Sequence, residues 1–329
     1  MMMTRKNFLG GTLGGLALMA LPRSGRAAGT LRFKMGFNDP DGSVYVQGGK
    51  KIAEEIARLT DNQIQVDVYS SAQLGGERDM YEGAQIGSID MPTCVNTVLS
   101  SFIPEATILD QPFIFDTADQ AHAAIDGKVG DLIAQKSLAQ GVHLVGWLES
   151  GFRDVFSDRP IKSLDDFKGF KIRTMENRMQ IAAFNALGAV ATPMAYGELF
   201  TALQQRTVDG CENAVGNMIT SRFYEVLKHV TYTHHQFTYI AVGFSDKAWN
   251  QIPKPLQPKV MEAVHNGVVF QRKLLEDFNA GSIDQLKKLT VQFYEVDRKA
   301  MKARVLPALE SFRKQMSKEW LKALDQYIA

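Results

Sequence analysis

The chain has 329 residues and a formal charge of +1 at neutral pH, and 45% of its residues are hydrophobic while 22% are charged. This balance is typical of a globular protein, and the near-neutral charge argues against a basic surface for nucleic acid or an acidic membrane. A chain of this length can bury a large core and normally divides into two domains. We therefore expect its partner to be a small molecule.

The N-terminus has the pattern of an export signal. Two basic residues precede an apolar run over residues 8–21, which is too short to span a bilayer. Small residues follow, so the pattern predicts a signal peptide over residues 1–27, cleaved after Ala27 or Ala28. The segment approaches a twin-arginine signal, but Lys6 replaces the second arginine, so the Sec and Tat routes both stay open. No second stretch has the roughly 18 apolar residues of a spanning helix, and we expect an exported protein that does not span the membrane.

The first part of the mature chain alternates between strand and helix patterns. The predicted elements are a strand over 31–37, an amphipathic helix that ends near 60–62, a strand over 64–68, a helix through 80–86 and a strand over 89–91. Such alternation indicates an α/β unit with a largely parallel sheet, whose ligands bind outside the carboxyl ends of the strands.

The pattern then restarts and indicates a second α/β unit. The predicted elements are a helix near 119–140, strands over 143–148 and 171–174, a helix over 179–187, a strand over 189–192, a helix over 198–205, a turn over 208–210 and a strand over 239–244. A long helix over 260–289 could brace both domains. The predicted domain I comprises 28–150 plus 239–278, and the predicted domain II comprises 151–238 plus 279–329.

Three polar side chains between Trp147 and Asn213 suggest a carboxylate site. Arg173 ends a predicted strand that follows the turn-forming pair Lys168-Gly169, and Arg153 and Asn213 flank it in sequence. Two arginines usually mean two solvated charges. Held at a strand end, however, a guanidinium can grip a carboxylate through two parallel hydrogen bonds, which lysine cannot do.

Signatures of other chemistry are missing from the sequence. It has no phosphate-binding glycine loop, no Gly-x-Ser-x-Gly elbow and no zinc-type cysteine or histidine spacing, so neither a cofactor nor a metal is expected. His234 and His235 are adjacent and would point to opposite faces of an extended segment, which favours a structural role. Cys94 and Cys211 are the only cysteines, and they could form a disulfide or remain buried thiols.

Six short motifs, in order along the chain, carry a resemblance to a known family. They are Lys34–Asn38, Gln73–Arg78, Lys168–Arg173, Gly188 with Pro193-Met194, Glu198 with Ala202–Gln204, and Val208–Asn213. Each is weakly specific alone, but in this order behind a signal peptide they are strongly specific. Over essentially its whole mature length the chain resembles the periplasmic solute-binding proteins of tripartite ATP-independent periplasmic (TRAP) transporters.

The resemblance implies a two-domain periplasmic-binding-protein clamshell of α/β class. Each domain would contain a mixed, mostly parallel sheet flanked by helices, with a long helix bracing the hinge. Such a protein binds an organic acid in its cleft, closes over it and delivers it to a membrane permease driven by an ion gradient. It would be a periplasmic monomer and not an enzyme.

The resemblance also implies roles for individual residues. Arg173 would pair with the ligand carboxylate, helped by Arg153 and Asn213. Asn38 and Glu77 match positions on the first domain's side of the cleft, where they would bond ligand hydroxyl or amine groups.

Three of the implied site residues have a structural alternative. Glu77 could simply complement a helix dipole. Tyr196 matches an aromatic that packs on the ligand, although a core tyrosine would look the same. Glu176 could face the cleft or only pair with Arg173.

The ligand itself is less well defined by the sequence. Val95 and Glu176 stand where the sialic-acid-binding branch has an acidic residue and an asparagine, which argues against sialic acid. A second anionic group would need another cation, and Arg78 is the only obvious candidate. We favour a hydroxylated monocarboxylate such as a sugar acid, with a four-carbon dicarboxylate or an aromatic acid as alternatives.

Two other classes of protein remain as rivals. An exported lyase or isomerase could use Arg153 and Arg173 to polarise a carboxylate, with Glu77 or Glu176 as the base. A binding protein of an ABC transporter shares the two-domain plan but lacks this order of motifs.

Overall fold

The computed structural model describes residues 30 to 328, so the signal peptide predicted over 1–27 lies outside the described residues. Its first half contains β1 (Leu31–Gly36), α1 (Val44–Leu59), β2 (Ile64–Tyr69), α2 (Glu77–Gln85), β3 (Thr93–Val95), α3 (Asn96–Leu99), η1 (Pro104–Asp110), α4 (Ala118–Ile125), α5 (Lys128–Leu138) and β4 (Val142–Ser157). Its middle contains η2 (Leu164–Phe167), β5 (Lys171–Thr174), α6 (Arg178–Ala186), β6 (Val190–Pro193), α7 (Tyr196–Gln204), β7 (Gly210–Asn213), α8 (Asn217–Thr220) and η3 (Phe223–Glu225). The last part contains β8 (His229–Ser245), α9 (Asp246–Gln251), η4 (Lys254–Leu256), α10 (Gln257–Lys288), β9 (Gln292–Glu295), α11 (Arg298–Gln315) and α12 (Lys318–Ile328).

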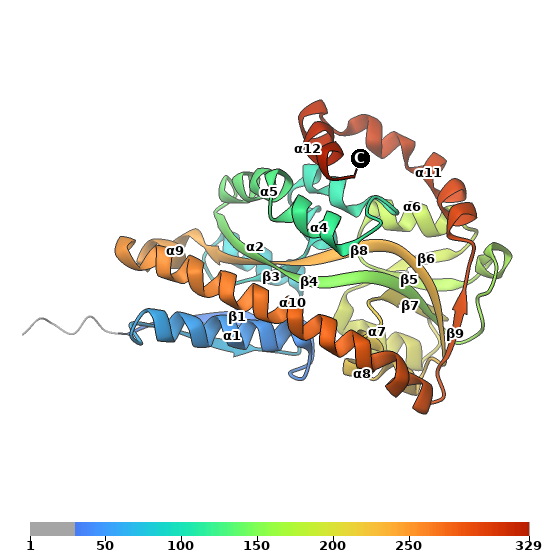
Figure 1. Cartoon of the computed structure of the whole chain (residues 1–329), viewed down its shortest axis with the longest axis horizontal. Helices are drawn as coiled ribbons and strands as arrows, with labels where there is room; N and C mark the ends of the chain where they lie inside the picture. The colour runs from blue at the N-terminus through green and yellow to red at the C-terminus, as the bar shows by residue number, and fades with distance from the viewer. Residues whose placement is uncertain (1–29, 329) are drawn as a thin grey trace, which may run out of the picture.

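The strands form two sheets, as an α/β protein should. β1 and β2 make a parallel pair, and the larger sheet has the order β3-β8-β4-β7-β5-β6 with β9 against β8. The larger sheet is mixed, because β4 and β8 are antiparallel while β5 runs parallel to β6 and β7. The predicted α/β class, with helices on both sheets, is confirmed (Figure 1).

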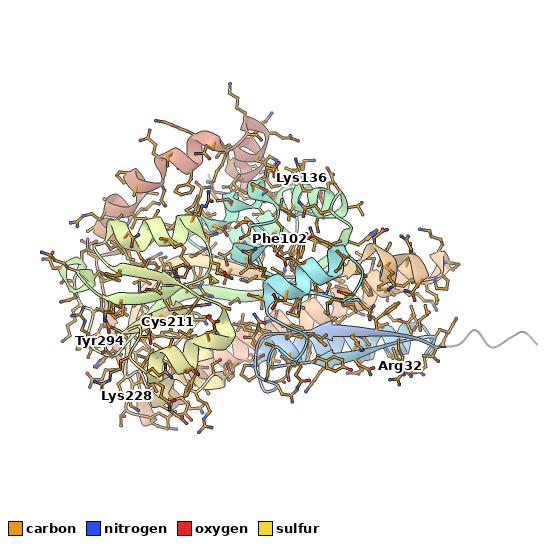
Figure 2. The ribbon with its side chains drawn as sticks, turned by 180° about the vertical axis from the view of Figure 1, so that it is seen from behind. Arg32, Phe102, Lys136, Cys211, Lys228 and Tyr294 are labelled. Atoms are coloured by element: carbon orange, nitrogen blue, oxygen red, sulfur yellow. The ribbon has the colours of Figure 1, made fainter. Side chains whose placement is uncertain are left out.

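Two lobes share the strands β4 and β8. One end of each strand packs in a core with β1, α1 and α10 that includes Leu148 and Val242, and the other end packs in the cores of α6 and α7 through Val155 and Val230. The ladder between the two strands has three register irregularities, and Gly151 at one of them has φ of +89°. Figure 2 shows the two ends of the molecule, with β1 at one and β9 at the other.

The long predicted helix is present as α10 and runs along both lobes (Figure 1). Val260, Val264 and Val268 lie in the first lobe's core, whereas Leu286 lies in a core of the second lobe. The helix also packs closely on α1, because a Cβ on Gly267 would lie 2.3 Å from Ile52 Cγ1. Glycine is therefore required at that crossing.

Several element predictions differ from the structure. Residues 89–91 form only an isolated bridge between Met91 and Met35. The helix predicted near 119–140 is broken into α4 and α5 at Gly127, where a Cβ would lie 2.3 Å from the Tyr327 hydroxyl. The strand predicted over 143–148 extends to Ser157, since its continuation is also paired with β8.

The C-terminal helix α12 packs on the first lobe. Trp320, Ala323 and Leu324 belong to the same core as residues of α4 and α5, although the predicted boundaries assign 279–329 to domain II. The division into domains stays a prediction.

Two further sequence expectations concern cysteines and membrane helices. Cys94 and Cys211 are both buried and free. Within residues 30–328, every helix is too short or too polar to cross a bilayer.

We predict that Gly267→Ala destabilises the protein while Gly281→Ala, in the same helix, stabilises it. Alanine in a helix is favoured over glycine by about 1 kcal/mol. A Cβ at Gly281 meets nothing within 4 Å, whereas at Gly267 it overlaps α1, and overpacking costs roughly 1–3 kcal/mol. Urea unfolding of both variants measures the change in the free energy of unfolding. Equal changes in the two variants would mean that α1 moves aside at no cost, which would contradict the prediction.

Candidate functional site

One pocket collects six of the seven predicted site residues. It is lined by Arg173, Arg153, Asn213, Asn38, Glu77 and Tyr196, together with Asp39, Tyr45, Val95, Ser150, Met175, Asn217 and Ile240. These residues come from both lobes. Glu176 is not among them.

Neighbouring strands position the two arginines. In the sheet, β7 lies between β4 and β5, so Arg153 on β4 and Arg173 on β5 flank it. Asn177 fixes the end of β5, because its Oδ1 accepts hydrogen bonds from the N–H groups of Met179 and Gln180, both at 3.0 Å, and so begins α6.

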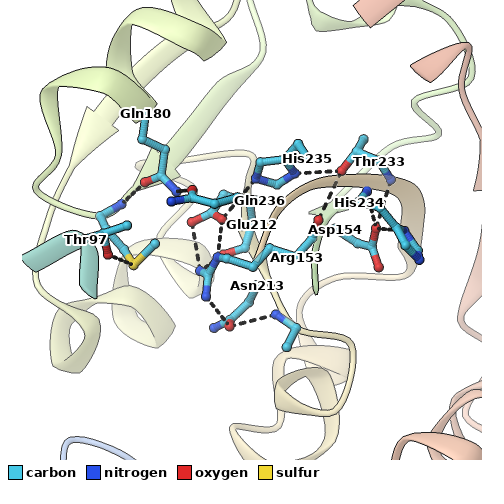
Figure 3. A network of polar contacts seen from close by, with 12 residues as sticks. Thr97, Arg153, Asp154, Gln180, Glu212, Asn213, Thr233, His234, His235 and Gln236 are labelled. Atoms are coloured by element: carbon cyan, nitrogen blue, oxygen red, sulfur yellow. Dashed lines mark hydrogen bonds and ion pairs between the residues drawn. The ribbon is translucent and has the colours of Figure 1, made fainter. Parts of the chain in front are cut away.

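Arg153 is neutralised by a buried carboxylate. Its Nε and Nη2 donate to Glu212 Oε2 and Oε1 at 2.5 and 2.9 Å, and its Nη1 donates to Asn213 Oδ1 at 3.0 Å (Figure 3). Both charged groups are almost fully buried. Burial alone would raise the pKa of Glu212, but Arg153 and the hydrogen bond with His235 outweigh it and lower that pKa to about 2. The pair is therefore ionised and internally balanced.

Arg173 has no such partner. Its Nε and Nη2 donate to the Met194 carbonyl at 3.0 and 2.7 Å, and no carboxylate of residues 30–328 lies within 4.0 Å of it as an ion pair. The residue is only 3% exposed, and burial lowers its pKa. A buried, unbalanced guanidinium is costly, so it favours an incoming anion.

Asn213 completes this side of the pocket as a donor. Its Oδ1 is occupied by Arg153 Nη1, by the Ala214 N–H at 2.8 Å and by Asn217 Nδ2 at 2.7 Å. Because the oxygen is saturated, the Nδ2 group is the part of this side chain left for a ligand acceptor.

The first lobe contributes acceptors. Asn38 Oδ1 is buried without a hydrogen-bond partner among the described residues, which is costly unless a ligand or water occupies the pocket. Glu77 begins α2 and accepts from the Val95 N–H at 2.9 Å, so it lies in the first helical turn and also lines the pocket.

Glu77 and a second carboxyl group, Asp39, are both hard to ionise. Burial raises the pKa of Glu77 to about 7. Burial, and then the charge of Glu77, raise the pKa of Asp39 to about 7. Near neutral pH the first lobe therefore presents two carboxyl groups that can accept or donate hydrogen bonds.

Tyr196 is both a pocket residue and a packed one. Its hydroxyl lies 2.5 Å from Ser221 Oγ, and its ring packs edge-on against Phe223. The Arg173 guanidinium lies 5.9 Å from the centre of the Tyr196 ring.

Glu176 lies outside the pocket. Its side chain is 40% exposed, and its Oε2 is 3.9 Å from Arg78 Nε rather than paired with Arg173. Both residues line a larger neighbouring cavity.

The histidine pair has structural partners. His234 Nδ1 lies 2.9 Å from Asp154 Oδ1, while His235 Nε2 lies 3.3 Å from Glu212 Oε2 (Figure 3). Across residues 30–328 no cluster of three or more acidic, histidine or cysteine side chains could hold a metal ion.

Sequence reasoning missed several residues that shape the site. Glu212 directly precedes the predicted residue Asn213, and Asp39 directly follows the predicted residue Asn38. The only sequence signal for either was that it is a charged residue next to a predicted site residue. Tyr45, Ser150 and Asn217 carried no distinguishing pattern, although Tyr45 and Ser150 meet at 3.2 Å.

The pocket is small. Its free space amounts to ≈ 40 Å³, which is room for about three water molecules. A larger ligand therefore requires the lobes or the lining side chains to move apart.

We predict that Glu212→Gln strongly destabilises the fold. It leaves the buried Arg153 charge unbalanced, which costs about 3–5 kcal/mol. Glu225→Gln, which breaks an exposed pair with Arg222, should cost less than about 1 kcal/mol. Denaturant unfolding measures the free energy of unfolding of both variants. A similar loss of stability in the two would contradict the inference that Glu212 neutralises the buried charge of Arg153.

We predict that Asp39→Asn stabilises the ligand-free protein at pH 8. Because the folded-state pKa is above the usual 3.8, ionisation of Asp39 costs stability progressively as pH rises from about 4 to about 7. The gain in stability from Asp39→Asn should therefore shrink as pH falls below 7. Because the Asp39 side chain is partly exposed, solvent screening limits the size of this gain. Melting temperatures from pH 5 to 8, with the exposed Asp41→Asn as control, test this, and a gain independent of pH would contradict it.

The fold and the pocket are those of a two-lobed solute-binding protein. The family model described as bacterial extracellular solute-binding protein, family 7, matches residues 35–315. The chain belongs to this family, which comprises the solute-binding proteins of TRAP transporters.

Relatives with known ligands support the assignment. The 2,3-diketo-L-gulonate-binding periplasmic protein YiaO of Escherichia coli is 31% identical over 285 residues, 86% of each chain. A TRAP periplasmic solute-binding protein from Polaromonas sp. JS666, bound to D-erythronate, is 34% identical with a TM-score of 0.86, over 89% of this chain and 98% of that one. The sugar acid binding protein DctPAm from Advenella mimigardefordensis, in complex with galactonate, is 30% identical with a TM-score of 0.88, over 91% and 98%. The predicted clamshell fold and TRAP family are thus confirmed.

Proposed function

We propose that the chain captures a hydroxylated monocarboxylate of the sugar-acid class and delivers it to the permease of a TRAP transporter. The observation that carries this proposal is the buried and unbalanced charge of Arg173. The ligand carboxylate pairs with Arg173 and receives further hydrogen bonds from Asn213. The protein works in the periplasm as a monomer, exported by the Sec or Tat route.

The remainder of the ligand is recognised by its hydroxyl groups. Asn38 Oδ1 lacks a partner, and Asp39 and Glu77 offer further acceptors on the first lobe. A ligand that spans the pocket contacts both predicted domains, so its binding favours the closed arrangement. The ligands of the similar proteins, erythronate and galactonate, have this combination of one carboxylate and several hydroxyls.

A four-carbon dicarboxylate fits the charges less well. Its second carboxylate would need a second free cation, but Arg153 is already balanced by Glu212. On the first lobe it would meet Asp39 and Glu77, which repel it when ionised. An aromatic acid would leave the polar acceptors of that lobe unpaired.

The lyase or isomerase alternative rests on Glu77, whose pKa of about 7 suits a general base. Glu176, the other proposed base, lies outside the pocket. We propose binding without turnover, and recovery of the acid unchanged after prolonged incubation would support that over catalysis.

We predict that Arg173→Gln abolishes tight binding of sugar acids without destabilising the apo protein. Loss of a buried charged hydrogen bond costs about 2–5 kcal/mol, or roughly 30-fold to several thousand-fold in Kd. Removing an unbalanced buried charge also relieves a desolvation cost, so the melting temperature of the apo protein should stay the same or rise.

Calorimetric titration with D-erythronate, galactonate, glucuronate and succinate tests both the residue and the ligand class. Arg159→Gln, an exposed arginine outside the pocket, serves as control. Tight binding of a sugar acid by Arg173→Gln would refute the role of this residue, and preferential binding of succinate by the wild type would refute the ligand class.

A further inference from the structure

The ligand pocket contains more negative than positive charge before any ligand enters. Arg153 is balanced by Glu212, so the remaining charged groups of residues 30–328 that line the pocket are Arg173, Asp39 and Glu77. With both carboxyl groups ionised, these three residues leave one negative charge in excess. A monocarboxylate ligand adds a second negative charge and displaces the water that would solvate it, so its capture needs one further positive charge.

Glu77 has partners that favour its ionised form. Its Oε1 accepts a hydrogen bond from the Val95 N–H at 2.9 Å. Burial raises the pKa of Glu77 to about 7, but this hydrogen bond and the charges of Arg173 and Arg153 oppose the rise, while the charge of Glu176 adds to it. A proton on Glu77 would therefore weaken contacts that the side chain already makes.

Asp39 has fewer such partners. Among the described residues, its carboxyl group is hydrogen-bonded only by its own backbone N–H. Burial, and then the charge of Glu77, raise its pKa to about 7, and the charge of Arg153 opposes the rise. The other titratable groups that act on it are the hydroxyls of Tyr45 and Tyr196. Burial raises the pKa of Tyr45 to about 12 and that of Tyr196 well above its usual value, so both stay neutral near pH 7.

The backbone that carries Asp39 is fixed beside the pocket. Its carbonyl accepts a hydrogen bond from the Ser71 N–H at 2.8 Å, and the Phe37 carbonyl accepts one from the Ala72 N–H at 2.9 Å. Both donors follow β2, and Pro40 restricts the chain on the other side of Asp39. The carboxyl group therefore stays at the wall of the pocket, and a ligand that fills the pocket requires its charge to be neutralised in place.

We propose that the pocket captures the sugar acid together with one proton, and that Asp39 is the residue that binds this proton. The proton comes from the solvent and adds to a carboxylate oxygen of Asp39. The resulting O–H donates to a hydroxyl oxygen of the ligand, and the second oxygen of Asp39 accepts from a ligand hydroxyl. The carboxyl group of the acid, whose usual pKa is about 4, stays ionised against Arg173. The inference rests on the proposed function, because it requires a hydroxylated monocarboxylate in this pocket.

The test is calorimetric titration of the protein with D-erythronate and galactonate at pH 6, 7 and 8, in pairs of buffers that differ in ionisation enthalpy. The Kd should rise about tenfold from pH 6 to pH 8, because a carboxyl group with a pKa of about 7 in the empty pocket must be neutral in the complex. The buffer dependence of the heat should show about one proton taken up per ligand at pH 8 and little uptake at pH 6.

Three variants assign the proton to a residue. In Asp39→Asn the Kd should change less than twofold between pH 6 and pH 8 and the proton uptake should vanish, because the amide resembles a protonated carboxyl group and does not titrate. Glu77→Gln should keep the proton uptake but move the pH dependence to lower pH, because the charge that raises the pKa of Asp39 is gone. Asp41→Asn, which changes an exposed partner of Lys50, should keep the wild-type pH dependence.

The remaining outcomes overturn the proposal. An equal Kd at pH 6 and pH 8 without proton uptake would exclude capture of a proton. Loss of the pH dependence in Glu77→Gln but not in Asp39→Asn would move the proton to Glu77. A pH dependence that persists in both variants would indicate a different titrating group, and His235 beside Glu212 would be examined next.

Failure of this inference is distinguishable from failure of the proposed function. If a sugar acid binds tightly but with a Kd that does not depend on pH, only the capture of a proton is refuted. If neither acid binds at any of the three pH values, the proposed function fails and this inference fails with it.

Discussion

The site depends on an asymmetry between two buried arginines. Arg153 has a carboxylate of its own in Glu212, whereas Arg173 is held only by a carbonyl oxygen. In the first arrangement the attraction between the two charges offsets much of the cost of burying them, and in the second we propose that an anionic ligand supplies the missing charge. Arg153 shapes the pocket and orients Asn213, while Arg173 provides the charge that we propose selects the ligand.

The sheet order makes this asymmetry possible. β7 separates the two arginine strands and carries Glu212 and Asn213 beside Arg153. The register pairs Arg173 with Cys211 rather than with Glu212, so the two arginines cannot share the carboxylate equally. A buried, free cysteine next to Arg173 keeps that neighbourhood apolar and leaves the guanidinium charge in need of a partner.

Motifs and local periodicity predicted the parts of the fold that depend on near neighbours. Helix α10, strand β5 and the position of Arg173 at its end all follow from short stretches of sequence. The break between α4 and α5 lies at Asp126-Gly127, a local turn signal that the prediction overlooked, whereas the packing of Tyr327 against Gly127, about two hundred residues away, follows from no local pattern.

The same limit applies to the site. Six predicted residues line one pocket, but the placement of Glu176 beside Arg78 depends on how two lobes meet, which spacing does not specify. The role of Glu212 was missed for a similar reason, since its partner lies 59 residues earlier on another strand.

The two strands that pass through both lobes also determine how the lobes can move. The two lobes are joined by more than a flexible linker. The strands β4 and β8 are hydrogen-bonded to each other and continue from one lobe into the other, and α10 also runs along both lobes. A change in the angle between the lobes must therefore bend these strands, and the three register irregularities, with Gly151 at one of them, are places where the ladder can bend. The lobes therefore open by bending of two continuous strands and not by rotation about a flexible loop. The stiffness of these strands sets how far the lobes of the ligand-free protein move apart.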